Sequence, residues 1–315
     1  MYSASVLAEI EKVNKPIHEY FDLICGTSTG GIIALALAVG ISAEEIKQFY
    51  LERGPRIFPH KHPFFLTLAF LKSFFWSSKY SNGELIKALT DTFKEIKMRD
   101  AKAYVCVPTV NLKDGENVVF KTNHDPSLTR DGDRLMADVA LATSSAPTFF
   151  PIAQVRGFNN GYFIDGGLWA NNPAFIGMVE AYCYFVGEGK PYQKFQMLSI
   201  PSINHEFPLP IKKLDLSFWD WREKIFQQIV NSQTRSVSQS MRLLSNHFLE
   251  GSEFTEIPGP TVCGKDAEKI GLDLATPDAI EILRGLGEKT GHQYNKRPDI
   301  VKFFQKKKEI PRLYN

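Results

Sequence analysis

The apolar residues of the first forty positions follow two patterns, one typical of helices and one of strands. Residues 3–13 carry apolar side chains at helical spacing, so the chain is predicted to begin within a helix. The apolar run 21–25 then predicts a strand, and the run 32–38, rich in Ala, Leu and Ile, predicts a buried helix. Residues 26–31 are therefore expected to form a sharp turn between a strand and a helix.

The same patterns predict the elements that follow. Helices are expected at about 43–53, 83–97, 135–143, 174–186, 216–249 and 279–286, and strands at 103–112, 117–122, 161–165 and 195–200. The alternation of strands and helices fades after Pro201. We therefore expect an α/β domain over residues 1–200, followed by a mainly helical C-terminal extension, 201–315, that packs on the same domain.

Two other segments allow more than one interpretation. Residues 62–80 are rich in aromatic side chains but include Lys72 and are too short to span a bilayer. They are expected to form a lid or an interfacial helix that dips into lipid, or else a helix packed in the core. The lysines of residues 302–308 predict a solvated terminal tail, with contact to anionic lipid as the alternative.

Composition narrows the function classes. The 37 basic and 35 acidic residues leave a net charge of +2, so no nucleic acid polymer is expected as a partner. The cysteines are scattered without metal-ligand spacing, which predicts reduced core thiols of a cytoplasmic protein: Cys25, Cys106, Cys183 and Cys263. No uninterrupted apolar stretch of 18 residues occurs, so no transmembrane helix is expected.

The predicted turn carries the first candidate for chemistry. Gly26–Gly30 reads Gly-Thr-Ser-Thr-Gly, the G-x-S-x-G pattern, between a strand and a helix. Gly26 and Gly30 are expected to avoid collisions where the two backbones meet, and Gly31 to let the helix lie close to the sheet. Ser28 would then lie at a helix N-terminus, which favours negative charge. This context predicts a nucleophile elbow; the alternative is an ordinary turn built from small residues.

A serine nucleophile needs a base that takes its proton. Three histidines occur late in the chain, none of them in a glycine-flanked loop at a strand end: His205, His247 and His292. Asp165 is the better candidate because it follows a strand and precedes Gly166 and Gly167, so it should project at the same sheet edge as Ser28. The alternative for Asp165 is ordinary Asp-Gly turn chemistry.

Taken together, these motifs resemble those of the patatin-like phospholipases, a family of serine lipid acyl hydrolases. The resemblance covers about residues 1–200 and rests on Gly26–Gly31, on Asp165–Gly167, on the later Asn171-Asn172-Pro173, and on the preceding loop Ala142–Pro151. It implies a patatin-like three-layer α/β sandwich with a mainly parallel central sheet.

The resemblance also implies a mechanism. In that family a Ser–Asp dyad acts without histidine, which makes Ser28 the nucleophile and Asp165 the base. The serine attacks an ester carbonyl, an acyl-enzyme forms, and the aspartate helps water to release the fatty acid. No metal or cofactor is needed. Gly26, Thr29 and Gly30 would form the elbow and the oxyanion site.

One departure from the family pattern stands at the start of the chain. The family carries a glycine-rich D-G-G-G-x-R-G stretch whose N–H groups hold the oxyanion, and Met1 begins where that stretch should end. Losing one oxyanion donor typically costs roughly 10²–10³ in rate. We expect a truncated sequence of an active enzyme; the alternative is a catalytically impaired fragment or a pseudoenzyme. The N–H of Thr29 could supply part of the oxyanion site.

Residues 165–173 resemble bacterial members of the family, including those switched on by cyclic oligonucleotides in anti-phage defence. The expected function is phospholipase A-type release of fatty acids from membrane phospholipids. The expected partners are a phospholipid membrane surface, a cyclic oligonucleotide activator and a second copy of the chain. Alternatives are a hydrolase of other acyl esters and a pseudoenzyme that binds lipid or a protein through residues 62–80. A nucleotide-binding α/β protein is disfavoured because Gly26–Gly31 lacks the P-loop lysine and the G-x-G-x-x-G spacing.

Overall fold

The computed structural model describes most of the chain: residues 1–59, 78–158, 161–200, 202–205, 215, 218–248, 250–271, 273–309, 311 and 313–314. The aromatic segment predicted at 62–80 lies, apart from its last three residues, outside the described residues.

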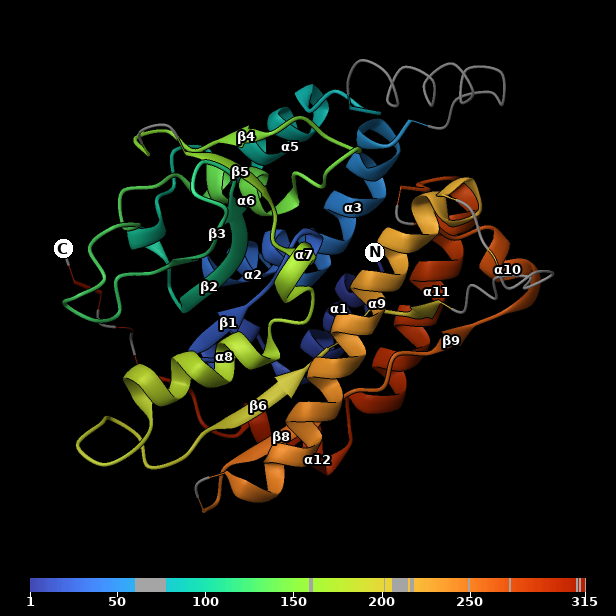
Figure 1. The fold of residues 1–315 in the computed structure, drawn as a ribbon. Helices are drawn as coiled ribbons and strands as arrows, with labels where there is room; N and C mark the ends of the chain where they lie inside the picture. Colours follow the sequence, from blue (N-terminus) through green and yellow to red (C-terminus); the bar gives the residue numbers. More distant parts are fainter. Residues whose placement is uncertain are drawn as a thin grey trace.

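Helices and strands are interspersed along the chain, and the last three of the described helices follow the last strand (Figure 1). The helices are α1 (Tyr2–Asn14), α2 (Thr29–Ala38), α3 (Ala43–Ile57), α5 (Gly83–Phe93), α6 (Met136–Ser144), α7 (Gly167–Ala170), α8 (Ala174–Glu180), α9 (Phe218–Leu244), α10 (Gly264–Glu268), α11 (Pro277–Tyr294) and α12 (Pro298–Val301). The strands are β1 (Leu23–Cys25), β2 (Tyr104–Asn111), β3 (Glu116–Lys121), β4 (Ala153–Gln154), β5 (Tyr162–Asp165), β6 (Gln196–Ser199), β7 (Asn204–His205), β8 (Glu253–Glu256) and β9 (Thr261–Val262).

Local sequence explains where the longer helices begin. Ser42 and Glu45 form a capping box at the start of α3, each side chain accepting from the other residue's N–H group. Thr276 caps α11 by accepting from the N–H of Ala279, and Pro277 occupies its first turn. Both helices thus begin within two residues of their predicted starts, and each extends beyond its predicted end.

β2 is the centre of a five-stranded sheet. It pairs with β1 in parallel and with β3 and β5 antiparallel, and β4 continues the sheet beyond β5, also antiparallel. Two further parallel pairs join β6 to β8 and β7 to β9. The predicted α/β class is confirmed, but the central sheet is mixed rather than mainly parallel. The reason is local: β2 and β3 form a hairpin, and β5 returns along β2 in the opposite direction.

β1 and β5 meet end to end along one edge of β2. Cys25, the last residue of β1, is paired with Cys106, and Asp165, the last residue of β5, is paired with Thr109. Because β1 runs with β2 and β5 runs against it, both strands end beside the middle of β2 and point toward each other. The loops that follow them are therefore brought together at this place.

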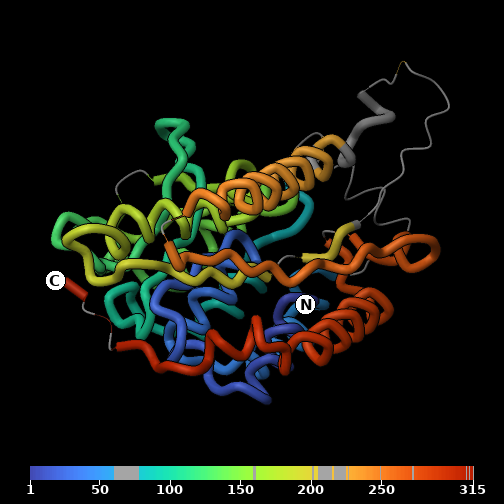
Figure 2. The backbone as a smooth tube through the Cα atoms, turned by 90° about the horizontal axis from the view of Figure 1, so that it is seen from below, coloured from blue at the N-terminus to red at the C-terminus, as the bar shows by residue number. Residues whose placement is uncertain are grey.

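Helices α2, α6 and α7 contact β2, and α8 contacts β1. Figure 2 shows α9, in orange, on one side of the molecule and α1 and α11, in blue and red, on the other. Phe93, Phe120 and Phe163 are among the large side chains buried in the main hydrophobic core. A smaller core under α8 and α9 includes Met178 and Met241.

The C-terminal region packs on the first residues of the chain. Phe303 and Phe304 are buried, and their rings lie against those of Phe21 and Tyr20 at centroid distances of 5.7 and 5.6 Å. The prediction of a solvated tail over residues 302–308 is therefore wrong for these two phenylalanines, because the aromatic ring pairs draw them into the core.

The cysteines differ from the prediction of four core thiols. Cys106 is buried and Cys25 is partly buried, whereas Cys183 and Cys263 are exposed. All four are free thiols. Burial raises the pKa of the Cys106 thiol, which lies beside Cys25 on the neighbouring strand.

The contact between α1 and α11 gives a first stability prediction. A Cβ atom at Gly287 would lie 2.5 Å from the backbone oxygen of Tyr2 and 2.6 Å from Cβ of Ser5, whereas at Gly285 it would meet nothing within 4 Å. We expect Gly287→Ala to destabilise the protein by roughly 1–3 kcal/mol, because α1 must move. Gly285→Ala, the matched control, should stabilise it by about 0.5–1 kcal/mol through helix propensity. Urea unfolding of both variants measures the difference, and equal effects would contradict the proposed close approach.

Candidate active site

Ser28 lies on a sharp turn between β1 and α2. Its backbone has φ 56° and ψ −129°, a conformation that a residue other than glycine adopts only when the surroundings enforce it. A Cβ atom at Gly26 would lie 2.0 Å from the backbone oxygen of Gly30. At Gly31 it would lie 2.7 Å from a methyl group of Thr143 on α6 and 3.2 Å from a methyl group of Val107 in β2. The predicted roles of Gly26 and Gly31 in close packing are therefore confirmed.

Gly30 does not have the packing role that the sequence predicted. A Cβ atom at Gly30 would meet nothing within 4 Å. Gly30 instead lies on the wall of a cavity, next to Ser28. Of these two glycines, only Gly26 prevents a collision between β1 and α2, because a Cβ atom at Gly26 would point at the first turn of α2.

Two threonines hold the turn in place. The N–H of Ser28 donates to Oγ1 of Thr143 at 2.9 Å, and that hydroxyl donates in turn to the backbone oxygen of Pro108 in β2 at 2.7 Å. Thr27 donates from its own hydroxyl to the backbone oxygen of Ala170 at 2.5 Å. The turn is thus tied to α6, to β2 and to the segment that follows β5.

Asp165 lies directly against the serine. The hydroxyl of Ser28 donates to Oδ2 of Asp165 at 2.5 Å, and the N–H of Gly167 donates to Oδ1 at 2.7 Å. Asp165 is 5% exposed. The structure therefore brings together the two residues that the sequence proposed as nucleophile and base, and both oxygens of the carboxylate are engaged.

Burial raises the pKa of Asp165 from its ordinary value to about 6, although the hydrogen bonds from Ser28 and from the N–H of Gly167 act in the opposite direction. At neutral pH the carboxylate is ionised and can accept a proton. Its raised pKa also makes it a stronger base than an exposed aspartate.

The segment after Asp165 is pressed against β2. A Cβ atom at Gly166 would lie 2.2 Å from the backbone oxygen of Pro108. The indole N–H of Trp169 donates to the backbone oxygen of Thr109 at 3.1 Å. Both residues were expected in the site loop: close approach requires a glycine at position 166, and Gly167 contributes its backbone N–H to the carboxylate of Asp165.

Some residues of this arrangement were not found from the sequence. Thr143 and Pro108 lie far from Ser28 in the chain, and no local pattern marks them as its partners. Thr143 belongs to the segment Ala142–Pro151 that carries part of the family resemblance, but nothing in that segment indicates a bond to Ser28.

The late histidines do not take part in this arrangement. His292 lies on α11, with its Nε2 3.2 Å from Oε2 of Glu9 on α1. His247 lies in the short turn that follows α9. Of the described residues that line the cavity at Ser28, none is a histidine.

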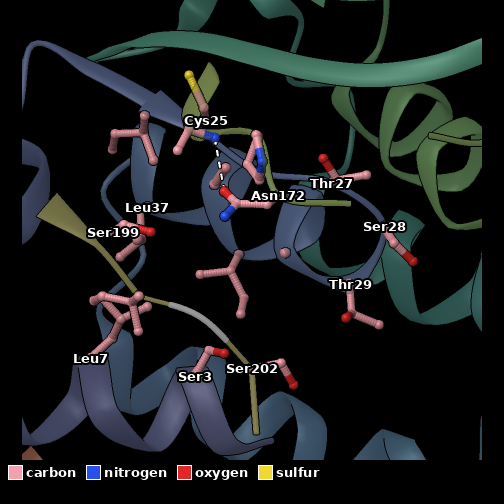
Figure 3. A pocket seen from close by; sticks show the side chains of 18 of the residues that line it. Ser3, Leu7, Cys25, Thr27, Ser28, Thr29, Leu37, Asn172, Ser199 and Ser202 are labelled. Carbon is pink, nitrogen blue, oxygen red and sulfur yellow. Dashed lines mark hydrogen bonds between the residues drawn. The ribbon is translucent and has the colours of Figure 1, made fainter. Parts of the chain in front are cut away.

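A cavity of about 1300 Å³ adjoins Ser28 and Asp165. Figure 3 shows Ser28 and Thr29 on one side of it, and Leu7 of α1 and Ser199 of β6 on the other. Among the described strands β1 pairs with β2 alone, and all three residues of β1 line this cavity.

Close to the serine, the hydroxyl of Tyr50 donates to the backbone oxygen of Thr29 at 2.7 Å. Apolar side chains that also line the cavity include Ile33, Phe58, Phe149 and Phe150. These side chains give the cavity an apolar wall that can accept an apolar ligand.

Within the described ranges, no group of three or more His, Cys, Asp or Glu side chains is arranged to hold a metal ion. Across those same ranges, none of the helices combines the length and the apolar character needed to cross a bilayer.

Comparison with known proteins supplies the family. The family model described as patatin-like phospholipase matches residues 1–178. A cGAMP-activated phospholipase of Escherichia coli (strain TW11681) is 35% identical over 325 aligned residues, covering 96% of this chain and 89% of the relative. A cGAMP-activated phospholipase of Pseudomonas aeruginosa (strain BWHPSA011 / Pa011) is 34% identical, covering 86% of this chain and 80% of the relative.

More distant matches were also found. Patatin-like protein 2 of Arabidopsis thaliana is 27% identical, covering 93% of this chain and 77% of the relative. The crystal structure of VipD from Legionella pneumophila matches with a TM-score of 0.41 at 11% identity, covering 96% of this chain and 64% of that one.

The family match spans β1, the Ser28 turn, β2, β5 and Asp165, and two relatives named as phospholipases match beyond it into the C-terminal region. The chain therefore belongs to the patatin-like phospholipase family of hydrolases.

Proposed function

We propose that this protein is a serine lipid acyl hydrolase of phospholipase A type, with Ser28 as nucleophile and Asp165 as base. The observation that carries the proposal is the 2.5 Å hydrogen bond from the Ser28 hydroxyl to a buried carboxylate. The membership of the phospholipase family and the strained turn at Ser28 support the same reading.

In the first step, Asp165 takes the hydroxyl proton while Oγ of Ser28 attacks the ester carbonyl of the lipid. The tetrahedral intermediate then expels the alcohol portion of the lipid, whose oxygen receives that proton from Asp165. The product is an acyl-enzyme on Ser28. No histidine is needed for either transfer, because the carboxylate reaches the serine directly.

Water completes the reaction. Asp165 takes a proton from a water molecule that attacks the acyl-enzyme, and it returns the proton to Oγ of Ser28 as the fatty acid leaves. The bond from the N–H of Gly167 to Oδ1 supports this cycle, because it keeps Oδ2 directed at Ser28 in both steps.

We propose that the N–H groups of Thr29 and Gly30 stabilise the oxyanion. They belong to the first turn of α2, where N–H groups have no acceptor within the helix. The dipole of α2 adds to their effect. The N–H of Ser28 itself is already engaged with Thr143, so it is not available for this purpose.

The substrate class follows from the cavity. Its apolar lining beside Ser28 supports an acyl chain as the bound group, and the phospholipid bilayer is the corresponding source. The protein is proposed to act at the membrane surface without crossing it. Residues 1–200 would supply the catalytic unit and residues 201–315 an extension packed on the same unit, as α11 does on α1.

Relatives named as cGAMP-activated phospholipases suggest how the activity is controlled. We propose that a cyclic oligonucleotide of this class activates the protein, and that it serves as an effector in bacterial anti-phage defence. The resemblance of residues 165–173 to bacterial members of that group supports the same conclusion.

The test is fatty-acid release from vesicles of mixed phosphatidylcholine, phosphatidylethanolamine and phosphatidylglycerol, with and without added cGAMP. We expect release that increases with cGAMP and falls to background in Ser28→Ala. A fluorophosphonate probe should label the unmodified protein and not the variant. Absence of both release and labelling would contradict the proposal and favour a lipid-binding or partner-binding protein.

A further inference from the structure

α9 presents a row of polar side chains to the segment that follows Asp165. Gln233, Thr234 and Ser238 each hydrogen-bond a residue between Trp169 and Asn172. Figure 1 shows α9 lying beside α7, which forms the first part of that segment. These three residues lie more than 60 positions away in the chain from the residues they contact.

Gln233 holds two points of the segment with one amide group. Its Nε2 donates to the backbone oxygen of Trp169 at 3.0 Å, and its Oε1 accepts from the N–H of Asn172 at 3.2 Å. Donor and acceptor of the amide are both used, so the group has one orientation and keeps residues 169 and 172 at a set separation.

Two hydroxyl groups extend the contact. Oγ1 of Thr234 accepts from the side-chain amide of Asn171 at 2.7 Å and donates to the backbone oxygen of Val230. Oγ of Ser238 accepts from the side-chain amide of Asn172 at 3.1 Å and donates to Oε1 of Glu256 on β8 at 2.8 Å. Each hydroxyl is thus oriented by a second partner.

Packing alone does not require these polar groups. The same face of α9 also carries Val230 and Met241, which are buried. Apolar side chains would fill such a contact without the cost of burying polar groups, roughly 1–3 kcal/mol for each one left unpaired. Because all three polar side chains are paired, the contact specifies the position of the segment in addition to covering it.

The segment leads directly to the catalytic carboxylate. Gly167 donates its N–H to Oδ1 of Asp165, and a Cβ atom at Gly167 would lie only 3.3 Å from Oδ1 of Asn171. On the inner side the segment is held by the bond from Thr27 to Ala170. On the outer side the described contacts from α9 hold Asn171 and its neighbours.

We propose that Gln233, Thr234 and Ser238 are positioning residues for Asp165, acting through the segment 166–172. Their effect on catalysis rests on the function proposed above, whereas their effect on the segment does not. The bond from the N–H of Gly167 to Asp165 lowers the pKa of the carboxyl, so its weakening raises that pKa further. A small displacement of Asp165 also lengthens its bond to Ser28.

The experiment compares Gln233→Ala with Gln239→Ala, which makes the same change on an exposed position of α9. Gln233→Ala should lower kcat for fatty-acid release roughly 10–100-fold with little change in KM, since misplacement of a catalytic group by about 1 Å has effects of this size. Its pH–rate profile should shift to higher pH. Gln233→Glu should not rescue activity, because it replaces the donor facing the oxygen of Trp169 by a second acceptor.

Hydrogen exchange of the resting protein gives a readout that needs no activity. The peptide covering residues 166–172 should exchange faster in Gln233→Ala and unchanged in Gln239→Ala. Unchanged exchange of this peptide in Gln233→Ala would overturn the proposal. So would faster exchange in Gln233→Ala if the unmodified protein is active and the variant keeps the same kcat and pH–rate profile. An unmodified protein without hydrolase activity would contradict the proposed function, while faster exchange would still support the hold of α9 on the segment.

Discussion

Asp165→Asn is expected to abolish hydrolysis and, at the same time, to stabilise the fold at neutral pH. The first effect follows from the loss of the base that takes the proton of Ser28, which is worth roughly 10²–10⁴ in rate. The second follows from burial, which raises the pKa of Asp165 to about 6 and therefore makes its charged form costly in the folded protein.

The pH dependence of this stabilisation has a definite sign. Between the ordinary value of 3.8 and about 6, the folded protein holds a proton at Asp165 that the unfolded chain has released. Stability therefore falls as the pH rises through this window and stays low above it. A shift of this size corresponds to about 3 kcal/mol, so Asp165→Asn can recover up to about that amount at pH 7.5 and little at pH 4.

Urea unfolding of both proteins at pH 4 and pH 7.5 measures this difference, and fatty-acid release measures the activity. The activity of the unmodified protein should rise as the pH passes through about 6, because the base must be ionised. Asp133→Asn is the control, since Asp133 lies at the surface in ion pairs with Lys97 and Arg99. Equal stabilities at pH 7.5, or retained hydrolysis in Asp165→Asn, would contradict the assignment.

The local elements of this site could be predicted because their signals are contiguous. The run from Phe21 to Ala38 contains a strand, the turn and a helix, and each follows from apolar spacing and glycine placement. Asp165 was predicted to reach the same edge as Ser28, and the two do meet. The reason differs in part, since β5 approaches along β2 from the direction opposite to β1.

Contacts between distant segments could not be predicted in the same way. Thr143 accepts a hydrogen bond from Ser28, 115 positions away in the chain, and Gln233 donates one to Trp169, 64 positions away. No sequence pattern around Thr143 or Gln233 indicates which residue it will contact. The hydrogen bonds depend on how α6 and α9 pack, which is decided by the whole core.

A glycine within a helical pattern can mark the end of the helix or a close contact with another helix, and the sequence alone does not distinguish the two. α11 was predicted to end at about residue 286, yet it continues to Tyr294 through Gly287 and Gly291. Glycine within a helical pattern often marks an end. Here both glycines face α1, where a Cβ atom would lie within 2.6 Å of its atoms, so they permit close helix packing instead.

Of the two glycines that flank Ser28, Gly26 is required by close packing and Gly30 is not. Gly26→Ala is therefore expected to prevent folding. Its Cβ would lie 2.0 Å from the oxygen and 2.5 Å from the carbon of the Gly30 carbonyl, and 2.8 Å from Cβ of Ala34. Two of these are backbone atoms of the first turn of α2, which cannot turn aside as a flexible side chain would. Separating β1 from α2 should cost about 4–5 kcal/mol or more, a large share of the stability of a typical domain.

Gly30→Ala is the matched comparison, because it makes the same chemical change four residues away. Its Cβ meets nothing within 4 Å, and alanine is favoured over glycine in a helix by up to about 1 kcal/mol, so this variant should fold with equal or greater stability.

The added methyl group would lie in the cavity wall beside Ser28, so phospholipid hydrolysis should fall while a small fluorophosphonate still labels the serine. Soluble yield, circular dichroism and thermal unfolding distinguish the two variants. If Gly26→Ala folds, or if Gly30→Ala is destabilised, the turn must pack differently from the arrangement described here. If Gly30→Ala folds and keeps full phospholipid activity, the acyl ester must approach Ser28 from another side.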